Sequence, residues 1–339
     1  MTGHPSSPSP VRRGLLVAGF AGALATRGVS AGAVSSVSSV SSVSSVSNLP
    51  NLPNVSNASA WPAAVDAPPV RLPASHQFDV TVAGVARRLF VALPAERPAT
   101  GPHPVLVVLD GNALFPLVAP LVRNRAVRPD AAHEPAPVVI GIGYPTDAPY
   151  DMQARADDYT LAPLPNGQGL AADRFLDFIE QDVQPWLARQ SQIDTGRQTL
   201  FGHSYGGLLT LYALLTRPHL FRRYVAASPS IWWGERALLP YADRFAAHAA
   251  PLDPSLRVVV TAGSLEEGAP NPDPERMRRL QARKQVSSAR DFVQRVGRRV
   301  GLDATFRLID GEDHGGVVMP SAALAVRVAC APGQREDAA

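Results

Sequence analysis

The residues best suited to covalent chemistry are the five from Gly202 to Gly206, which read Gly-His-Ser-Tyr-Gly. A strand-like run over residues 198–201 precedes them, and an apolar helical run, Leu208 to Leu215, follows them. In that setting glycines permit a sharp strand-to-helix turn that holds a serine hydroxyl clear of the backbone. The pattern therefore predicts that Ser204 is a nucleophile, with a purely structural turn as the alternative.

A serine hydroxyl is a weak nucleophile and needs a base, which a third group orients. Where this turn occurs, the usual chain order is serine, then acid, then histidine. His314 follows a strand-like run over 305–309 and has glycines near it on both sides, so it is the predicted base. The weaker candidates are His219 at a helix end, His248 in an alanine-rich stretch, and His203 beneath the nucleophile.

The predicted orienting acid is Glu266, in the turn after the strand-like run 257–261. Asp313 is adjacent to His314 in the chain, which makes it a poor orienter. The alternatives that remain are Glu267, Asp273, Asp291, or no third residue at all.

Negative charge that develops on an attacked carbonyl oxygen needs fixed hydrogen-bond donors. The backbone N–H of Tyr205, directly after the nucleophile, is the first expected donor. The second is the backbone N–H of Asn112, in the turn Leu109-Asp110-Gly111-Asn112 after an early strand. A simple turn at Asp110-Gly111 is the alternative.

Two further segments are candidates for binding a substrate. Trp232 and Trp233 follow the strand-like run 224–227 and are expected to form a wall of the site, although buried packing would also explain them. Arg155 precedes Asp157-Asp158-Tyr159-Thr160 and is expected to bind an anionic or electron-rich group. A salt bridge within the loop is the competing interpretation of Arg155.

The elements that must position these residues follow from the hydrophobic pattern. Residues 77–82 and 87–93 alternate apolar with polar side chains around Ala83-Gly84, which predicts an antiparallel hairpin. Continuous apolar runs at 105–109, 138–142, 199–201 and 258–261 suit strands covered on both faces. Two stripes at helical spacing alternate with them: Phe175, Phe178, Ile179, Val183 and Trp186, then Ala289, Phe292, Val293, Val296 and Val300. Together they predict an α/β fold with a mostly parallel, doubly wound sheet.

Composition narrows the class of protein. The chain has 339 residues and a formal charge of +3, too small to argue for nucleic-acid binding. The single cysteine, Cys330, excludes an intrachain disulfide. Eight arginines flank the second helical stripe and predict a solvated helix face, with anion attraction as the alternative; they are residues 276, 278, 279, 283, 290, 295, 298 and 299.

The N-terminus resembles an export signal over residues 1–33. Arg12-Arg13 precede an apolar run, Leu15 to Ala25, which is too short for a stable membrane span, and Ala31-Gly32-Ala33 offers a cleavage site. The general or the twin-arginine route would deliver the protein to the periplasm or outside the cell. Residues 34–70 read as a disordered low-complexity linker, 71–332 as the catalytic domain and 333–339 as a polar tail.

Four segments together resemble the putative-esterase branch of the α/β-hydrolases: residues 109–113, 202–207, 228–233 and 313–315. Arg155 with Asp158-Tyr159-Thr160 narrows the likeness to periplasmic esterases that open trilactone catecholate siderophores. The resemblance covers roughly residues 76 to 329.

That resemblance implies an α/β-hydrolase fold, catalysis by Ser204 and His314, and an oxyanion donor at Asn112. It also implies that Arg155 contacts the siderophore, free or ferric. The expected chemistry needs neither a metal nor an organic cofactor. A broad-specificity acyl esterase or acyltransferase is one alternative, and a siderophore-binding protein with little turnover is another. The oligomeric state is left open.

Overall fold

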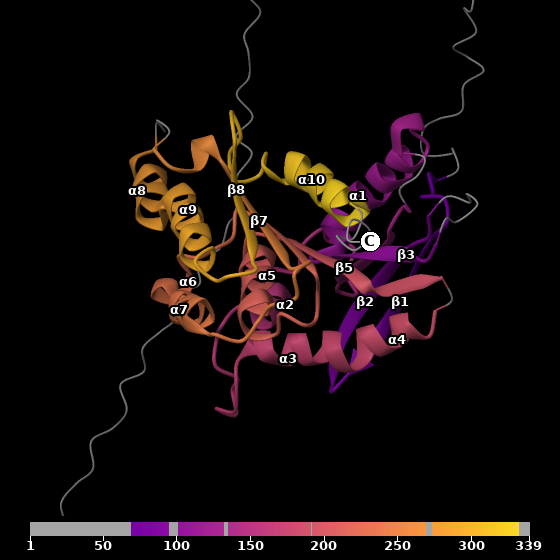
Figure 1. The fold of residues 1–339 in the computed structure, drawn as a ribbon, viewed down its shortest axis with the longest axis horizontal. Helices are drawn as coiled ribbons and strands as arrows, with labels where there is room; N and C mark the ends of the chain where they lie inside the picture. Colours follow the sequence, from indigo (N-terminus) through magenta and orange to yellow (C-terminus); the bar gives the residue numbers. More distant parts are fainter. Residues whose placement is uncertain (1–68, 95–100, 132–134, 191, 269–272, 332–339) are drawn as a thin grey trace, which may run out of the picture. The chain divides into compact units, whose positions relative to one another are not determined.

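The computed structural model describes residues 69–94, 101–131, 135–190, 192–268 and 273–331. The expected export signal, most of the expected linker and the polar tail lie outside these residues. The described chain forms an eight-stranded sheet in the order β1-β2-β4-β3-β5-β6-β7-β8 (Figure 1). The strands are β1 (Ser75–Val82), β2 (Val85–Ala92), β3 (His103–Val108), β4 (Val138–Gly143), β5 (Ile193–His203), β6 (Arg223–Ala227), β7 (Arg257–Gly263) and β8 (Asp303–Ile309).

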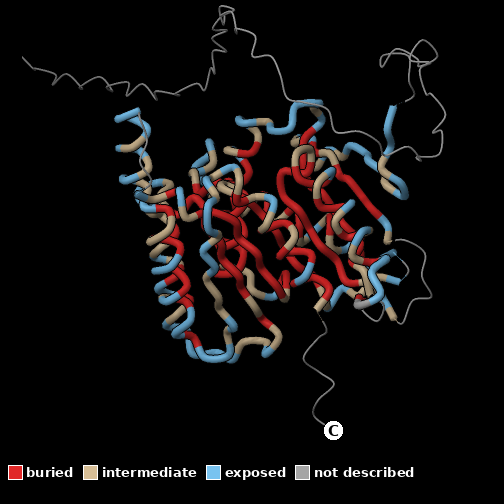
Figure 2. The backbone as a smooth tube through the Cα atoms, turned by 90° about the horizontal axis from the view of Figure 1, so that it is seen from above, coloured by how far each residue is buried: buried red, intermediate tan, exposed pale blue. Residues whose placement is uncertain are grey.

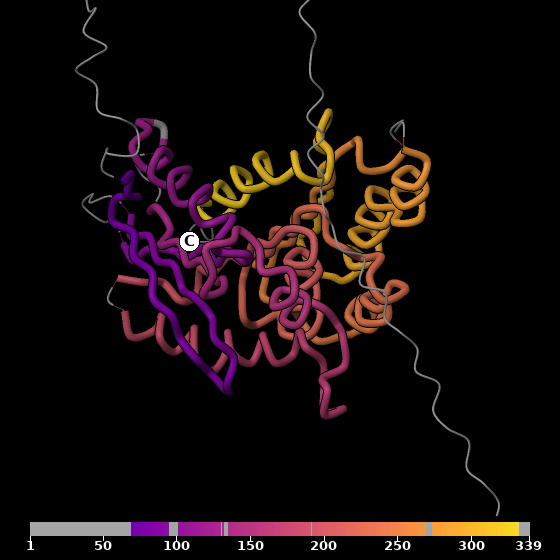
Figure 3. The backbone as a smooth tube through the Cα atoms, turned by 180° about the vertical axis from the view of Figure 1, so that it is seen from behind, coloured from indigo at the N-terminus to yellow at the C-terminus, as the bar shows by residue number. Residues whose placement is uncertain are grey.

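The sheet confirms the predicted topology. The hairpin β1–β2 is antiparallel, and β2 pairs antiparallel with β4. Every other neighbouring pair is parallel. Figure 3 shows the hairpin at one end of the sheet and β8, with the helices next to it, at the other. This is the α/β-hydrolase arrangement with its N-terminal hairpin.

Helices cover both faces of the sheet, because alternate residues of each buried strand point to opposite sides. On one face, Leu106 and Phe201 pack with α1 (Gly111–Ala126) and α10 (Val318–Cys330). On the other, Val107 and Leu200 pack with α3 (Ala171–Phe178), α5 (Tyr205–Thr216) and α9 (Gln285–Val296). Figure 2 shows the buried chain concentrated in the central strands between these layers.

The remaining helical segments are α2 (Met152–Tyr159), the π turn η4 (Ile179–Val183), α4 (Gln184–Ala188), α6 (Trp233–Arg236), α7 (Leu239–Ala247), α8 (Pro274–Arg283), and the 3-10 turns η3 (Pro129–Ala131) and η5 (Ser264–Glu266). Among the described residues no helix is both long and apolar enough to cross a bilayer.

The two predicted helical stripes have different outcomes. The first is present, although the π turn η4 separates α3 from α4 within it. The second is correct through Val296 and wrong at Val300, whose side chain is 92% exposed. The helix α9 ends at Val296 and Gly297 follows as its cap, so Val300 falls outside the helical register.

Candidate active site

The candidate nucleophile lies in a strained turn between β5 and α5. Ser204 has φ 58° and ψ −114°, a conformation that side chains other than glycine rarely adopt. The backbone N–H of Ser204 donates to the carbonyl of Ala227 at 3.0 Å, which ties the turn to β6. A Cβ added to Gly202 would lie 2.3 Å from the carbonyl oxygen of Gly206, so glycine is required there. The strain therefore comes from a turn that the neighbouring strand holds in place.

His314 lies beside this serine, although the two residues are 110 positions apart. It occupies the loop between β8 and α10, and its Nε2 is 3.1 Å from Ser204 Oγ. Its side chain is 39% exposed, so the face of the imidazole that a substrate would approach remains open. At this distance the imidazole can accept the hydroxyl proton.

Glu266 is the third member of a hydrogen-bonded relay, Ser204–His314–Glu266, and it lies at the end of η5 after β7. Its Oε2 is 2.6 Å from His314 Nδ1. Its Oε1 accepts from the backbone N–H of Gly263 at 2.7 Å and from the hydroxyl of Ser228. The side chain is 2% exposed. A buried carboxylate with donors on both oxygens is held in one orientation, as an orienter of histidine requires.

The other acids considered for this position have different partners. Glu267 bonds the hydroxyl and backbone N–H of Ser287. Asp273 caps the N-terminus of α8, and Asp291 lies exposed on α9. The two histidines considered as alternative bases also lie elsewhere. His219 pairs with Glu180, and His248 accepts from the backbone N–H of Ala250.

Three residues that the sequence analysis did not assign support the relay. Ser228 is fully buried with φ 41° and donates to Glu266. Ser230 Oγ is 3.3 Å from Ser204 Oγ. His203 packs its ring 4.7 Å from the ring of His314 and bonds the backbone carbonyl of His314 through Nε2 at 2.8 Å. The only sequence signal for these residues is that they lie next to the strand-to-helix turn at residues 202–206, here called the elbow, or next to the strand end at Ala227.

His203 is held neutral by its surroundings. Burial, with a smaller contribution from the neighbouring His314, lowers the pKa of His203 from its usual 6.5 to about 3. A second positive charge directly under His314 would oppose protonation of the base during catalysis. The depressed pKa of His203 therefore suits a supporting role rather than proton transfer.

The two expected oxyanion donors lie in the first turns of two helices. Tyr205 begins α5 and Asn112 is the second residue of α1, and backbone N–H groups at these positions have no intrahelical acceptor. The side chain of Asn112 is engaged elsewhere: its amide donates to the carbonyls of Tyr144 and Thr146 at 2.9 and 2.8 Å. Its oxygen accepts from the backbone N–H of Tyr144 at 2.8 Å. Only the backbone N–H of Asn112 remains for a substrate.

Arg155 forms a buried ion pair with Asp110, in the turn 109–112 that carries the expected donor Asn112. Its Nε and one terminal nitrogen donate to the two carboxylate oxygens of Asp110 at 2.9 and 3.0 Å, and it is 5% exposed. Burial works against the charge of Arg155, but the hydrogen bonds and charge of Asp110 raise its pKa overall. Asp110 has a left-handed backbone with φ 52°, and its N–H donates to Tyr159 Oη. Arg155 is therefore part of a salt bridge, but its partner is Asp110 in the turn after β3 and not an acid of its own segment, as the competing interpretation expected.

A second buried ion pair supports the same region. Arg87 on β2 donates to both oxygens of Asp158 at 3.0 and 2.7 Å, and each side chain is 2% exposed. The hydroxyl of Tyr144 donates to Asp158 at 3.2 Å. The helix α2, which carries Arg155, is therefore fixed from below by Asp158.

The two tryptophans have different surroundings. Trp233 packs against the core next to the sheet. Trp232 lies beside the elbow, with its ring centroid 6.3 Å from that of Tyr205. The guanidinium of Arg283 lies 4.4 Å from the centroid of the Trp232 ring. Of the pair, Trp232 is the one in contact with the residue that follows the candidate nucleophile.

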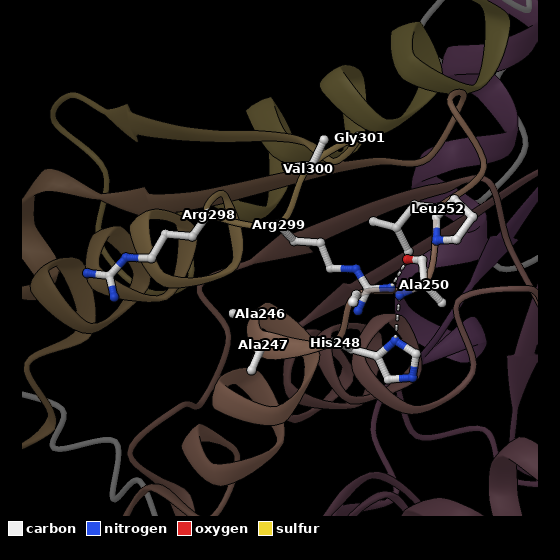
Figure 4. A pocket seen from close by; sticks show the side chains of 11 residues that line it. Ala246, Ala247, His248, Ala250, Leu252, Arg298, Arg299, Val300 and Gly301 are labelled. Atoms are coloured by element: carbon white, nitrogen blue, oxygen red, sulfur yellow. Dashed lines mark hydrogen bonds between the residues drawn. The ribbon is translucent and has the colours of Figure 1, made fainter.

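A cavity of about 470 Å³ lies at a different place, between the end of α7 and the turn after α9. Residues 246–252 and 298–301 line it, and none of the relay residues does (Figure 4). Arg299 donates there to the carbonyls of Phe245 and Ala250 at 2.6 and 2.8 Å. Because this guanidinium satisfies carbonyls at a helix end, we interpret the cavity as a structural gap rather than as the site of chemistry.

The fold and the site define an α/β-hydrolase, and comparison with known proteins places the chain within that class. Residues 81–299 match the family described as "Putative esterase". The chain belongs to this family and is a hydrolase that acts on esters.

Two curated relatives are similar over most of their length. "Ferri-bacillibactin esterase BesA" of Bacillus subtilis is 33% identical over 255 residues, which are 72% of this chain and 84% of the relative. "Siderophore triacetylfusarinine C esterase" of Aspergillus fumigatus is 36% identical over 268 residues, 74% of this chain and 91% of the relative. Among solved structures, "Siderophore hydrolase EstB from Aspergillus nidulans" is 29% identical with a TM-score of 0.69, covering 80% of this chain and all of that one.

Proposed function

We propose that the protein is a serine esterase that hydrolyses the ester bonds of a catecholate siderophore trilactone, free or iron-bound, and so aids iron release. The observation that carries the serine mechanism is the continuous relay from Ser204 Oγ to His314 Nε2 at 3.1 Å and from His314 Nδ1 to Glu266 at 2.6 Å. The substrate class rests on the names of the relatives, which are siderophore esterases, and on the sequence resemblance.

In the first half of the reaction, Ser204 Oγ attacks the ester carbonyl as His314 Nε2 takes its proton. Glu266 keeps Nδ1 protonated and Nε2 free to act as the base. The negative oxygen that forms is stabilised by the backbone N–H groups of Tyr205 and Asn112. His314 then returns the proton to the leaving alkoxide, which departs as an alcohol and leaves an acyl-serine.

In the second half, water replaces the alcohol. His314 removes a proton from the water, the hydroxide attacks the acyl carbonyl, and Ser204 Oγ leaves with the proton back from His314. The products are a free acid and the unchanged enzyme. Opening the lactone ring would loosen the hold of the siderophore on iron.

A direct test incubates the purified protein with a trilactone and follows linear products by chromatography, alongside Ser204→Ala. Wild type should give linear products, and Ser204→Ala should lose at least about 10⁴-fold in kcat. A fluorophosphonate probe should label the peptide that contains Ser204. Cleavage of simple esters with no opening of the trilactone would refute the substrate and favour a broad acyl esterase. Binding of the siderophore with no turnover by wild type would favour a binding protein.

We also propose export to the periplasm or the cell exterior. The support is the pattern of arginines, apolar run and small residues before position 34, which lies outside the described residues. Mass spectrometry of the mature N-terminus after expression in a bacterial host tests this, and an uncleaved chain in the cytoplasm would contradict it.

A further inference from the structure

The helix α8 carries one arginine whose environment differs from that of the others. No residue of α8 is buried, and Arg276, Arg278 and Arg279 are exposed. Arg283, at the C-terminal end of the helix, is half-buried, with its guanidinium 4.4 Å from the Trp232 ring centroid. The expectation of a solvated arginine face therefore holds for most of α8 but not for Arg283.

Arg283 lies at one end of a row of cations and aromatic rings that reaches the nucleophile. The row runs from Arg283 to the ring of Trp232, and from there to the ring of Tyr205 at 6.3 Å. Tyr205 directly follows Ser204, and the guanidinium of Arg155 also lies 5.3 Å from the Tyr205 ring. A group bound at Arg283 and Trp232 would therefore lie against the ring that neighbours Tyr205, the residue after the reacting serine.

The two cations of this row differ in charge balance. Asp110 neutralises Arg155. Among the described residues, no carboxylate forms an ion pair with Arg283, whereas Arg279 one turn earlier pairs with Glu275 at 3.6 Å. Burial lowers the pKa of Arg283, and the nearby Tyr205 and Glu266 only partly offset this. A half-buried cation without a counter-ion is stabilised by an anion that binds beside it.

The position of Arg283 is fixed by the start of the next helix. Gln285, two residues later, donates from Nε2 to the carbonyl of Pro229 at 2.7 Å and is buried. Pro229 belongs to the same turn as Trp232, so one bond ties the two parts of the row together. Ser287 adds a second tie through Glu267. Arg283 and Trp232 are thus held in register before any ligand arrives, which reduces the entropy cost of binding.

We propose that Arg283 and Trp232 form the acyl-side specificity subsite, which selects substrates whose acyl part carries an anionic aromatic ring. A guanidinium that lies over an aromatic ring can keep the N–H donors around its edge available for the oxygens of an anion. The exposed part of Trp232 supplies the surface on which the ring of the acyl group stacks. This deepens the proposed function, on which its assignment to the acyl side rests, because each acyl unit of a catecholate trilactone carries an aromatic ring whose oxygens are anionic when they hold iron.

The test compares two esters that differ in charge: 4-nitrophenyl benzoate and 4-nitrophenyl 4-sulfobenzoate. The measured quantity is the ratio of kcat/KM for the anionic ester to that for the neutral one. Wild type should prefer the anionic ester, and Arg283→Gln should lower the ratio about tenfold, as expected for loss of one partly buried charge contact. Arg283→Lys should fall between them, because it keeps the charge without the planar donor edge.

The matched control is Arg278→Gln, which removes the same charge from the exposed side of α8. In the part of the chain that the structure describes, its guanidinium donates to the carbonyl of Pro274 in the same helix and to no other group, so its ratio should equal that of wild type. Raising the salt concentration should reduce the ratio in wild type more than in Arg283→Gln. Trp232→Leu provides a second variant that removes the stacking surface, and it should lower kcat/KM for both aromatic esters.

Several results would overturn the subsite. One is equal ratios in wild type, Arg283→Gln and Arg278→Gln. A second is an equal loss of kcat/KM on both esters in Arg283→Gln, which would indicate a structural role for Arg283. A third is a fall in the ratio for Arg278→Gln as large as that for Arg283→Gln, which would indicate a general electrostatic effect of α8. The proposed function is judged separately, by whether wild type opens the trilactone. If wild type does not open the trilactone but the ratio still depends on Arg283, the siderophore is rejected as the substrate while the subsite is retained.

Discussion

Replacing Glu266 by glutamine keeps the shape of the side chain and removes its charge. The oxygen that remains can still accept from Gly263 and Ser228, so the amide group of the variant turns toward His314 Nδ1. An amide N–H at that position needs an acceptor, so Nδ1 must be unprotonated. The single proton of the neutral imidazole then lies on Nε2. A protonated Nε2 cannot take the proton of Ser204, so the base is in the wrong tautomer.

The size of the loss follows from this geometry. A carboxylate-to-amide change in a serine–histidine–acid relay lowers kcat by about 10⁴-fold when the geometry is otherwise intact. We expect Glu266→Gln to lose about 10³- to 10⁴-fold in kcat on 4-nitrophenyl butyrate, with KM little changed, because Glu266 is 2% exposed and does not reach the substrate. Labelling of Ser204 by a fluorophosphonate should slow by a similar factor.

The matched control is Glu267→Gln. It changes the adjacent carboxylate, which bonds Ser287 rather than His314, so kcat should stay within about twofold of wild type. Circular dichroism and thermal unfolding of both variants show whether each remains folded. Nearly full activity in a folded Glu266→Gln variant would refute the relay, and a large loss in Glu267→Gln alone would move the role to that residue.

Two further predictions concern the groups that support the site. Arg155→Met leaves Asp110 buried without a partner and should lower the free energy of unfolding by about 3–5 kcal/mol in urea titrations; a rise in KM with unchanged stability would instead favour direct substrate contact. His203 is neutral when folded, with a pKa of about 3 against 6.5 when unfolded, so its contribution to stability is complete above pH 6.5 and declines as the pH falls toward 3. Between about pH 7.5 and about pH 4.5, His203→Gln should therefore lose about 3 kcal/mol less stability than wild type. Equal pH slopes for the two proteins would show that His203 is not buried as a neutral group.

Much of the fold could be predicted from the sequence, because its signals are local. Continuous apolar runs predicted the central strands, and the predicted hairpin turns at Ala83-Gly84, with Val82 opposite Val85. The error at Val300 arose because an apolar residue continued the helical spacing beyond the helix end. Spacing alone does not reveal that α9 ends at Val296, three residues before Arg299 turns to cap α7.

The site could be predicted only in part. A local motif, Gly-His-Ser-Tyr-Gly, predicted Ser204 as the nucleophile. His314 and Glu266 were predicted from chain order and from their positions after predicted strands. For Ser228 and His203 the sequence showed only their positions beside a strand end and beside the nucleophile, because their contacts are with residues 38 and 111 positions away. The pairing of Arg155 with Asp110 is likewise a contact across 45 positions, so a free cation and a salt bridge look the same in sequence.

Within the described residues, the strand β8 forms one border of the sheet and pairs only with β7, and several of its side chains are open to solvent. The loop that follows it carries His314, whereas Ser204 follows the interior strand β5. Borders of a sheet detach at lower free energy than its interior. A transient fraying of this flank would withdraw the imidazole while the elbow stayed intact. The lifetime of the active enzyme would then be limited by local unfolding at β8 rather than by global unfolding of the protein.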